Sequence, residues 1–287
     1  MTVIAMTREM GSRGKDVALG LASRFGLEII HHEIIEHDLA ERLNLPESSV
    51  HHFLEGEASL FERWKIDRSR LSLYTKVEIL ELACRGNVLI RGWGSAQLLR
   101  GIGNVLCIRI CAPMRCREDV LLARVPSLKD RKSARAEIER NDAAHRNVIE
   151  RLFQANWRDP EHYDLVLNTE RLSIDACVDQ VSHLARLSDF QQTESSRRQL
   201  SDKLIEFRIR GRLSSLSNSP GLRISVGAGT VSLDGTVYDG ELAHMIERTV
   251  RQTDGVIDVD NRMRIMASPN IDSSALASDP IYKKLPF

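Results

Sequence analysis

Three residues near the start of the chain, Gly11, Gly14 and Lys15, have the types and spacing of a phosphate-binding turn. They follow a short apolar run at residues 3–6 and precede residues 18–25, where apolar side chains recur at helical spacing. Glycine lets backbone amides curl around an anion, the start of a helix adds positive partial charge, and lysine adds a full charge. The segment therefore predicts a strand, a phosphate-binding loop and a helix.

The loop differs in two positions from the common phosphate-loop pattern G-x-x-x-x-G-K-[ST]. Glu9 stands where the first glycine is usual, and Asp16 stands where a hydroxyl would hold Mg²⁺. A carboxylate at Asp16 can hold Mg²⁺ through water, and Ser12 or Thr7 could supply the hydroxyl instead. Taken alone, the segment also fits an ordinary turn between a strand and a helix.

Short apolar runs alternate with helical patterns over residues 1–187, the first predicted domain. The apolar runs lie at residues 88–90, 105–110 and 165–168, and the clearest helical patterns at residues 70–83 and 136–153. This alternation is typical of an α/β fold, in which helices cover both faces of a parallel sheet. Ligands of such sheets bind at the carboxyl ends of the strands, where the predicted loop lies.

A different pattern follows a polar segment at residues 188–198, which predicts a linker. Within residues 199–266, two amphipathic helical patterns and three apolar alternating segments occur in the order αββαβ. That order predicts a small second domain. Residues 267–287 show no periodicity and predict a flexible tail.

The composition of the 287-residue chain limits its partners and location. Forty basic and forty acidic residues cancel, so the charge predicts no nucleic-acid partner. No apolar run approaches about 18 residues and no signal-peptide pattern occurs, which predicts no transmembrane segment and a cytoplasmic location. Most of the five cysteines lie in apolar stretches, which favours reduced thiols, and their spacing predicts no metal centre.

Six short motifs in the first domain occur in a characteristic order. They are residues 7–15 (TREMGSRGK), 33–35 (EII), 92–94 (GWG), 112–117 (APMRCR), 157–160 (WRDP) and 163–169 (YDLVLNT). In this order they resemble the cytidylate kinase-like family, a branch of the P-loop nucleoside monophosphate kinases. That family also lacks the first glycine of the common loop pattern.

The resemblance implies ATP and Mg²⁺ as cofactors and assigns roles to residues of this chain. The phosphates of ATP would lie against Gly11, Ser12, Arg13, Gly14, Lys15 and Asp16. Catalytic charge would come from Lys15, Arg140 and Arg146, the two arginines lying in a cation-rich segment that closes over the phosphates. The substrate-binding residues would be His31, His32, Arg91, Trp93 and Arg117.

The chain departs from the family pattern on the acceptor side. His31 and His32 replace an Asp-Arg pair, and Trp93 replaces the arginine of a G-R-G element. His145 stands where an arginine is expected, with Arg146 one position later. Tryptophan cannot hold a phosphate bidentately but can stack on a base, and Arg91 could take the place of the lost guanidinium. Nucleotide binding is therefore better supported than phosphoryl transfer.

The second domain resembles a BON domain. The resemblance lies in residues 224–226 (ISV), 229–237 (GTVSLDGTV) and 255–261 (GVIDVDN). In that family the second segment is a hairpin and the third leads into the last strand. The resemblance implies a binding or attachment module, with a protein or a membrane surface as its partner.

Two functions are compatible with these observations. The first is a cytidylate-kinase-like enzyme that phosphorylates CMP, dCMP or a related small acceptor, with a regulatory or docking module behind it. The second is a nucleotide-binding sensor with little or no turnover, which acts through the BON-like domain. The order of the motifs favours the enzyme, whereas Trp93, His31 and Asp16 favour the sensor.

Overall fold

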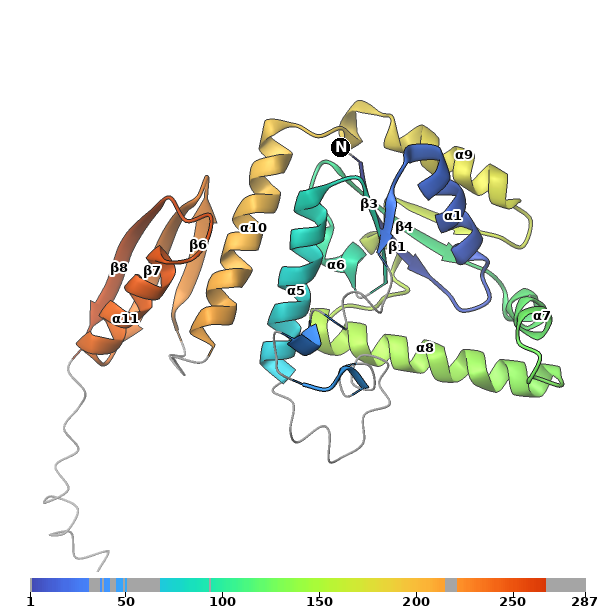
Figure 1. Ribbon diagram of the computed structural model, residues 1–287, viewed down its shortest axis with the longest axis horizontal. Coiled ribbons are helices and arrows are strands. Elements are labelled where there is room, and N and C mark those ends of the chain that lie inside the picture. Colours follow the sequence, from blue (N-terminus) through green and yellow to red (C-terminus); the bar gives the residue numbers. More distant parts are fainter. Residues whose placement is uncertain are drawn as a thin grey trace, which may run out of the picture.

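The computed structural model contains two sheets joined by one long helix, α10 (Figure 1). It describes residues 2–30, 37, 39–41, 45–48, 50, 68–92, 94–214 and 221–266. Three predicted substrate-binding residues, His31, His32 and Trp93, lie outside the described residues, as does the predicted tail at residues 267–287.

The first sheet has five parallel strands in the order β2-β3-β1-β4-β5. In chain order the strands are β1 Val3–Arg8, β2 Glu28–Ile30, β3 Val88–Arg91, β4 Val105–Cys111 and β5 Leu165–Asn168. The central strand, β1, pairs with β3 and β4, so that Met6 lies opposite both Arg91 and Ile108. The carboxyl ends of these strands therefore meet at one edge, as the predicted α/β fold requires.

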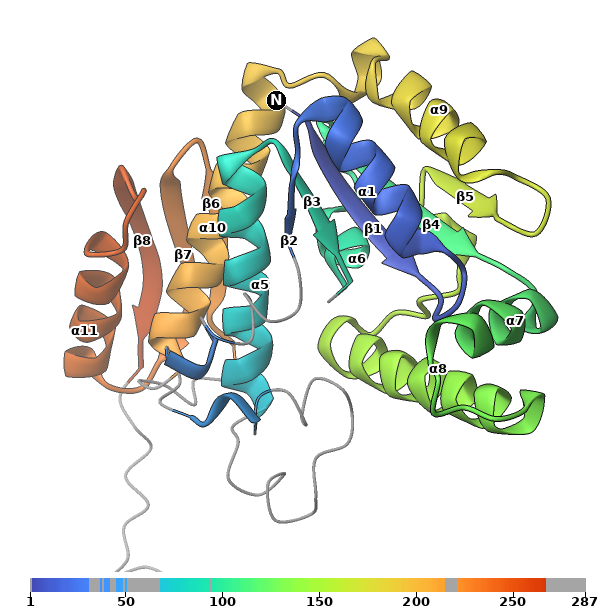
Figure 2. The same cartoon turned by 45° about the vertical axis from the view of Figure 1, so that its right-hand side comes forward.

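Helices cover both faces of this sheet (Figure 2). Along β1, Ile4 and Met6 pack into a core with α1 (Gly14–Phe25) and α9 (Ile174–Ala185). Val3 and Ala5 point into the opposite core, with α5 (Arg68–Arg85) and α6 (Ser95–Leu99). A strand that is buried on both faces must be apolar at every position, which explains the continuous apolar runs of the sequence.

Two helices form a hairpin at the carboxyl-end side of the sheet (Figure 2). They are α7 (Met114–Arg124) and α8 (Arg131–Phe153). A capping box between Asp130 and Ser133 starts α8 by satisfying its first amides. The α7–α8 hairpin reaches the predicted loop through Met10, which packs against the buried side chains Leu121 and Ile138.

The second sheet has three strands in the order β6-β7-β8. Strands β6 (Arg223–Gly227) and β7 (Thr230–Val237) are antiparallel, and β7 pairs in parallel with β8 (Asp258–Ile265) across helix α11 (Gly240–Arg251). Together with α10 (Glu194–Leu213), this is the predicted αββαβ order. Among the helices that the structure describes, none has the length and apolar content to cross a membrane.

Helix α10 contributes side chains to both cores. Leu200 and Leu204 join the core of the first sheet beside α5, whereas Ile205 and Ile209 join the core of the second sheet. An ion pair between Arg208 and Glu81 of α5 adds to the contact. The predicted linker, residues 188–198, consists in part of a short 3-10 helix (Ser188–Phe190) and the first turn of α10.

Candidate phosphate-binding site

The turn between β1 and α1 has the backbone shape of an anion-binding loop. Gly11 and Arg13 both have left-handed backbone conformations, with φ values of 77° and 60°. The amide of Ser12 donates to the carbonyl of Glu9, and the amide of Asp16 donates to that of Arg13. Within the described chain, the amides of residues 11 and 13–15 have no acceptor. They are available to an anion at the positive end of α1.

Two glycines of the turn are required by close backbone and side-chain contacts. A Cβ atom on Gly11 would lie 2.6 Å from the carbonyl oxygen of Arg117, and one on Gly14 would lie 2.7 Å from Cβ of Arg8. Arg13, in contrast, carries a side chain despite its left-handed backbone, a conformation that costs an L-residue roughly 1–2 kcal/mol. The loop thus keeps glycine where space demands it and accepts strain at Arg13.

The charged and hydroxyl side chains of the loop differ in their ion pairs and hydrogen bonds. Lys15 is exposed on the first turn of α1 and has no ion pair with any described residue. Asp16 pairs with Arg124 at the end of α7. The Ser12 hydroxyl is fully buried and has no hydrogen-bond partner within the described chain. Thr7 is buried, and its side chain lies beside the hydroxyl of Tyr163.

These groups fit a phosphate with a bound Mg²⁺. The available amides and Lys15 suit the phosphate oxygens, and the unpartnered Ser12 hydroxyl suits either the phosphate or the ion. Asp16 is half-buried beside the loop and can reach the ion through water. Of the two hydroxyls that the sequence offered, Ser12 is therefore the better placed.

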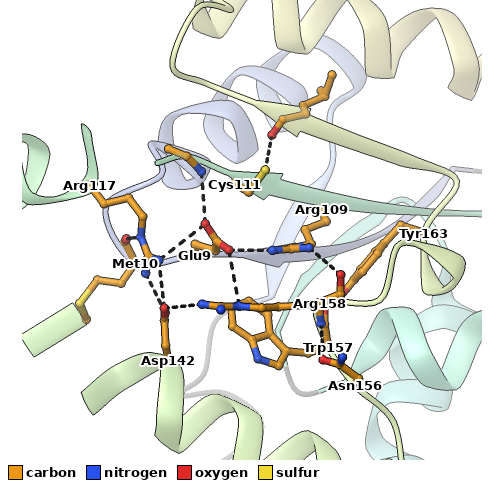
Figure 3. A network of polar contacts seen from close by, with 12 residues as sticks. Glu9, Met10, Arg109, Cys111, Arg117, Asp142, Asn156, Trp157, Arg158 and Tyr163 are labelled. Carbon is orange, nitrogen blue, oxygen red and sulfur yellow. Dashed lines mark hydrogen bonds and ion pairs between the residues drawn. The ribbon is translucent and has the colours of Figure 1, made fainter. Parts of the chain in front are cut away.

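Glu9 is the centre of a buried network of charges behind the loop (Figure 3). Its carboxylate lies 2.7 Å from Nη2 of Arg109 on β4 and accepts a hydrogen bond from the amide of Ala112. Arg117 of α7 lies 3.7 Å away. The residue that replaces the usual first glycine thus anchors the turn to the neighbouring strand.

Asp142 of α8 is the second carboxylate of this network (Figure 3). It receives two hydrogen bonds from Arg117, of 2.9 and 2.7 Å, and one of 2.8 Å from Arg158. Nε of Arg117 donates to the Met10 carbonyl at 2.6 Å. Arg117 therefore ties the loop to α8. Its role in substrate binding stays a prediction, and a substrate phosphate would have to compete with Asp142.

An aromatic pair lies beside these charges. The guanidinium groups of Arg109 and Arg158 lie 5.3 and 5.2 Å from the ring centre of the buried Trp157. The ring of His145 forms a T-shaped pair with the same ring, at a centroid distance of 4.7 Å. Burial of the imidazole lowers the pKa of His145 to about 4, although Asp142 acts in the opposite direction. At neutral pH His145 is therefore uncharged and does not replace an arginine.

The remaining residues predicted for catalysis or substrate binding lie on α8 and at the end of β3. Arg140 and Arg146 are exposed on α8, and Arg140 pairs with Glu137 at 3.0 Å. Arg91 is buried at the carboxyl end of β3, in register with Met6 of β1. The structure thus brings Arg91 and residues 11–16 to one edge of the sheet.

Sequence reasoning missed most of the network behind the loop. It did not single out four of its residues, Arg109, Asp142, Trp157 and Arg158, as parts of one site. One signal was available, because Arg109 interrupts an otherwise apolar strand and a buried charge there requires a partner.

Comparison with known proteins places the chain in the cytidylate kinase-like family, to which it belongs. The profile of that family matches residues 3–171, and that of the BON domain matches residues 201–267. Cytidylate kinases of Pyrobaculum aerophilum and Pyrobaculum islandicum are each 26% identical over 181 residues, covering 62% of this chain and 89% of theirs.

A solved structure shares the fold of the first domain. It is an uncharacterized protein from Eubacterium ventriosum, with 16% identity and a TM-score of 0.51. The match covers 64% of this chain and 98% of that protein. The family assignment rests on the sequence matches, and this structure supports the fold alone.

Replacement of Gly11 by alanine tests the fit of the loop against α7. We expect Gly11→Ala to lower the free energy of unfolding by roughly 1–3 kcal/mol more than Gly26→Ala, because only Gly11 would meet a neighbouring backbone. Gly26 has a similar φ of 62° but open space around it. Chemical denaturation of both variants measures the difference, and equal losses would contradict the packing argument.

Removal of the Glu9 charge tests the buried network. We expect Glu9→Gln to cost about 3 kcal/mol of unfolding free energy, because Arg109 keeps its positive charge in a buried site without its carboxylate. Glu137→Gln is the matched control, since it removes an exposed partner of Arg140 and should cost less than about 0.5 kcal/mol. Urea denaturation measures both, and a Glu9→Gln cost as small as that of the control would refute the role of the network.

The lowered pKa of His145 predicts a stability change with pH. The unfolded chain binds a proton at this histidine below about pH 6.5, whereas the folded chain does so only below about pH 4. Stability should therefore fall by about 3 kcal/mol as the pH decreases through this window, and the penalty should be absent above pH 6.5. In His145→Phe this part of the loss should disappear. The measurement is urea denaturation of both proteins between pH 4 and 7, and parallel curves would contradict it.

Proposed function

We propose that this protein is a nucleotide kinase that transfers the terminal phosphoryl group of ATP to a nucleoside monophosphate, with CMP and dCMP as the preferred acceptors. The observation that carries the proposal is the turn at residues 9–16. It combines available amides, an exposed Lys15 and an unpartnered Ser12 hydroxyl at the carboxyl edge of a parallel sheet. Membership of the cytidylate kinase-like family supports the choice of reaction.

Phosphoryl transfer requires positioning and positive charge more than covalent chemistry. In the proposed reaction the amides of residues 11 and 13–15 hold the β- and γ-phosphates. Lys15 neutralises the charge that develops while the γ-phosphorus leaves the bridging oxygen and bonds to an oxygen of the acceptor. Mg²⁺ would supply further neutralisation when held near Ser12 and Asp16. The rigid network behind Glu9 keeps the amides in place before the nucleotide arrives.

Fewer observations support the residues proposed to bind the acceptor nucleotide. Arg91 is the predicted cation at the sheet edge, and Trp93 is proposed to stack on the base, with His31 and His32 beside the acceptor phosphate. Arg140 and Arg146 are proposed to approach the phosphates from α8, where both are exposed. The cytoplasmic location and the regulatory or docking role of the BON domain also remain predictions.

A second candidate function is a nucleotide sensor that binds ATP without efficient transfer. Two observations favour it. Arg117, a predicted substrate ligand, is fully engaged by Asp142 and Met10, and His145 is uncharged at neutral pH. Both reduce the positive charge available to an acceptor phosphate.

An activity assay on the Lys15→Met variant distinguishes the two functions. We expect ADP release from the wild type in the presence of CMP or dCMP, and a loss of kcat/KM of about 100-fold or more in Lys15→Met. Arg24→Gln is the control, because it removes a cation from the opposite end of α1, where Arg24 pairs with Asp179. Its activity should equal that of the wild type.

Calorimetry with ATP and Mg²⁺ completes the experiment. If ATP binds to the wild type but no ribonucleoside or deoxyribonucleoside monophosphate stimulates ADP release, the result would support the sensor and contradict the enzyme. No binding to the wild type would overturn both functions.

A further inference from the structure

A polar cleft lies between the two domains, away from the phosphate loop. Its volume is about 380 Å³, which is in the range of small-molecule sites. Four helices supply its walls: α5, α6, the end of α8 and α10. The side chains that carry its chemistry are Lys76, Gln97, Phe153, Lys203 and Phe207.

The described residues place more cations than carboxylates around the cleft. Among the described residues, neither Lys76 of α5 nor Lys203 of α10 forms an ion pair. The charges that act most strongly on Lys76 are the cations Arg210 and Lys203, whereas the carboxylate of Glu206 acts on Lys203. One hydrogen bond of Lys203 goes to the Leu98 carbonyl at 2.6 Å. Burial and the two neighbouring cations lower the pKa of Lys76. Of the described charges that act on the two lysines, Glu206 is the one carboxylate and it already pairs with Arg210, so three cations face a single negative charge.

The same cleft offers surfaces for the rest of a ligand. Phe153 and Phe207 flank Lys76, with the ammonium 5.4 and 5.5 Å from their ring centres. Gln97 donates through Nε2 to the hydroxyl of Tyr163, which itself donates to the carbonyl of Trp157. This fixes the amide, and its buried Oε1 has no partner within the described chain.

We propose that this cleft binds a phosphate monoester that carries a ring and is about the size of a mononucleotide. Lys76, Lys203 and Arg210 against Glu206 leave an excess of two positive charges, which matches a dianion better than the single charge of a carboxylate. The phenylalanine rings contact the apolar or planar part of the ligand, and Oε1 of Gln97 accepts a hydrogen bond from its N–H or O–H group. Because α10 belongs to both cores, the ligand touches both domains at once.

Calorimetry on the full chain tests the site with phenyl phosphate as the probe. Phenyl phosphate should bind to the wild type, and the dissociation constant should rise at least 10-fold in Lys76→Met and in Lys203→Met. Arg223→Met, which removes an exposed positive charge on β6, should bind as the wild type does. Unchanged affinity in Lys76→Met, or an equal loss in Arg223→Met, would overturn the proposal.

Two further measurements test the choice of a phosphate and the role of Lys76. Benzoate and phenol should bind at least 10-fold more weakly than phenyl phosphate, and equal binding of benzoate would overturn the choice of a phosphate. The melting temperature of ligand-free Lys76→Met should equal or exceed that of the wild type, because the substitution removes a repelled cation. A variant that unfolds instead would show that Lys76 is a packing residue and would refute the site. None of these outcomes depends on kinase activity.

Discussion

The position of the phosphate loop depends on the buried pairing of two carboxylates with three guanidinium groups. Glu9 and Asp142 are almost completely buried, and so is Arg117 between them. Charges removed from water are tolerated only when every one has a partner. Since Glu9 belongs to the loop, Arg117 to α7 and Asp142 to α8, none of these elements can shift without exposing or orphaning a charge. The network thus fixes the loop in the shape that leaves its amides available.

The same network explains why this loop lacks the usual first glycine. Left-handed backbone is needed at Gly11 and Arg13, and Glu9 has no positive φ. A side chain at position 9 is therefore free of strain, and its carboxylate reaches Arg109 and the amide of Ala112 on and after β4. Glu9 therefore attaches the loop to the sheet, whereas a glycine at this position would leave the loop more flexible. Three guanidinium charges against two carboxylates also leave the surroundings of the loop positive, which suits an anionic ligand.

The sequence predicted the elements better than the contacts between them. Continuous apolar runs and helical periodicity report burial directly, so the parallel sheet and the αββαβ order could be inferred. Arg117 could not be understood in this way, because its partner Asp142 lies 25 positions away and either charge alone resembles a solvated side chain. His145 raised the same difficulty, since its lowered pKa comes from burial that no local pattern shows. The polar segment before α10 predicted a linker, although Thr193 and Ser196 form a capping box that starts the helix there.

Helix α10 makes the two domains dependent on each other. Burial of Leu200 and Leu204 against the first domain is worth roughly 3–6 kcal/mol in total, and Ile205 and Ile209 hold the opposite face in the second core. Separation of the helix from either domain would therefore cost several kcal/mol of burial free energy. The lysines beside this contact act in the opposite sense, because the repulsion between Lys76 and the cations of α10 grows as α10 approaches α5. An anion between them would remove that repulsion, so the junction is the place where a small ligand can change how firmly the second domain is held.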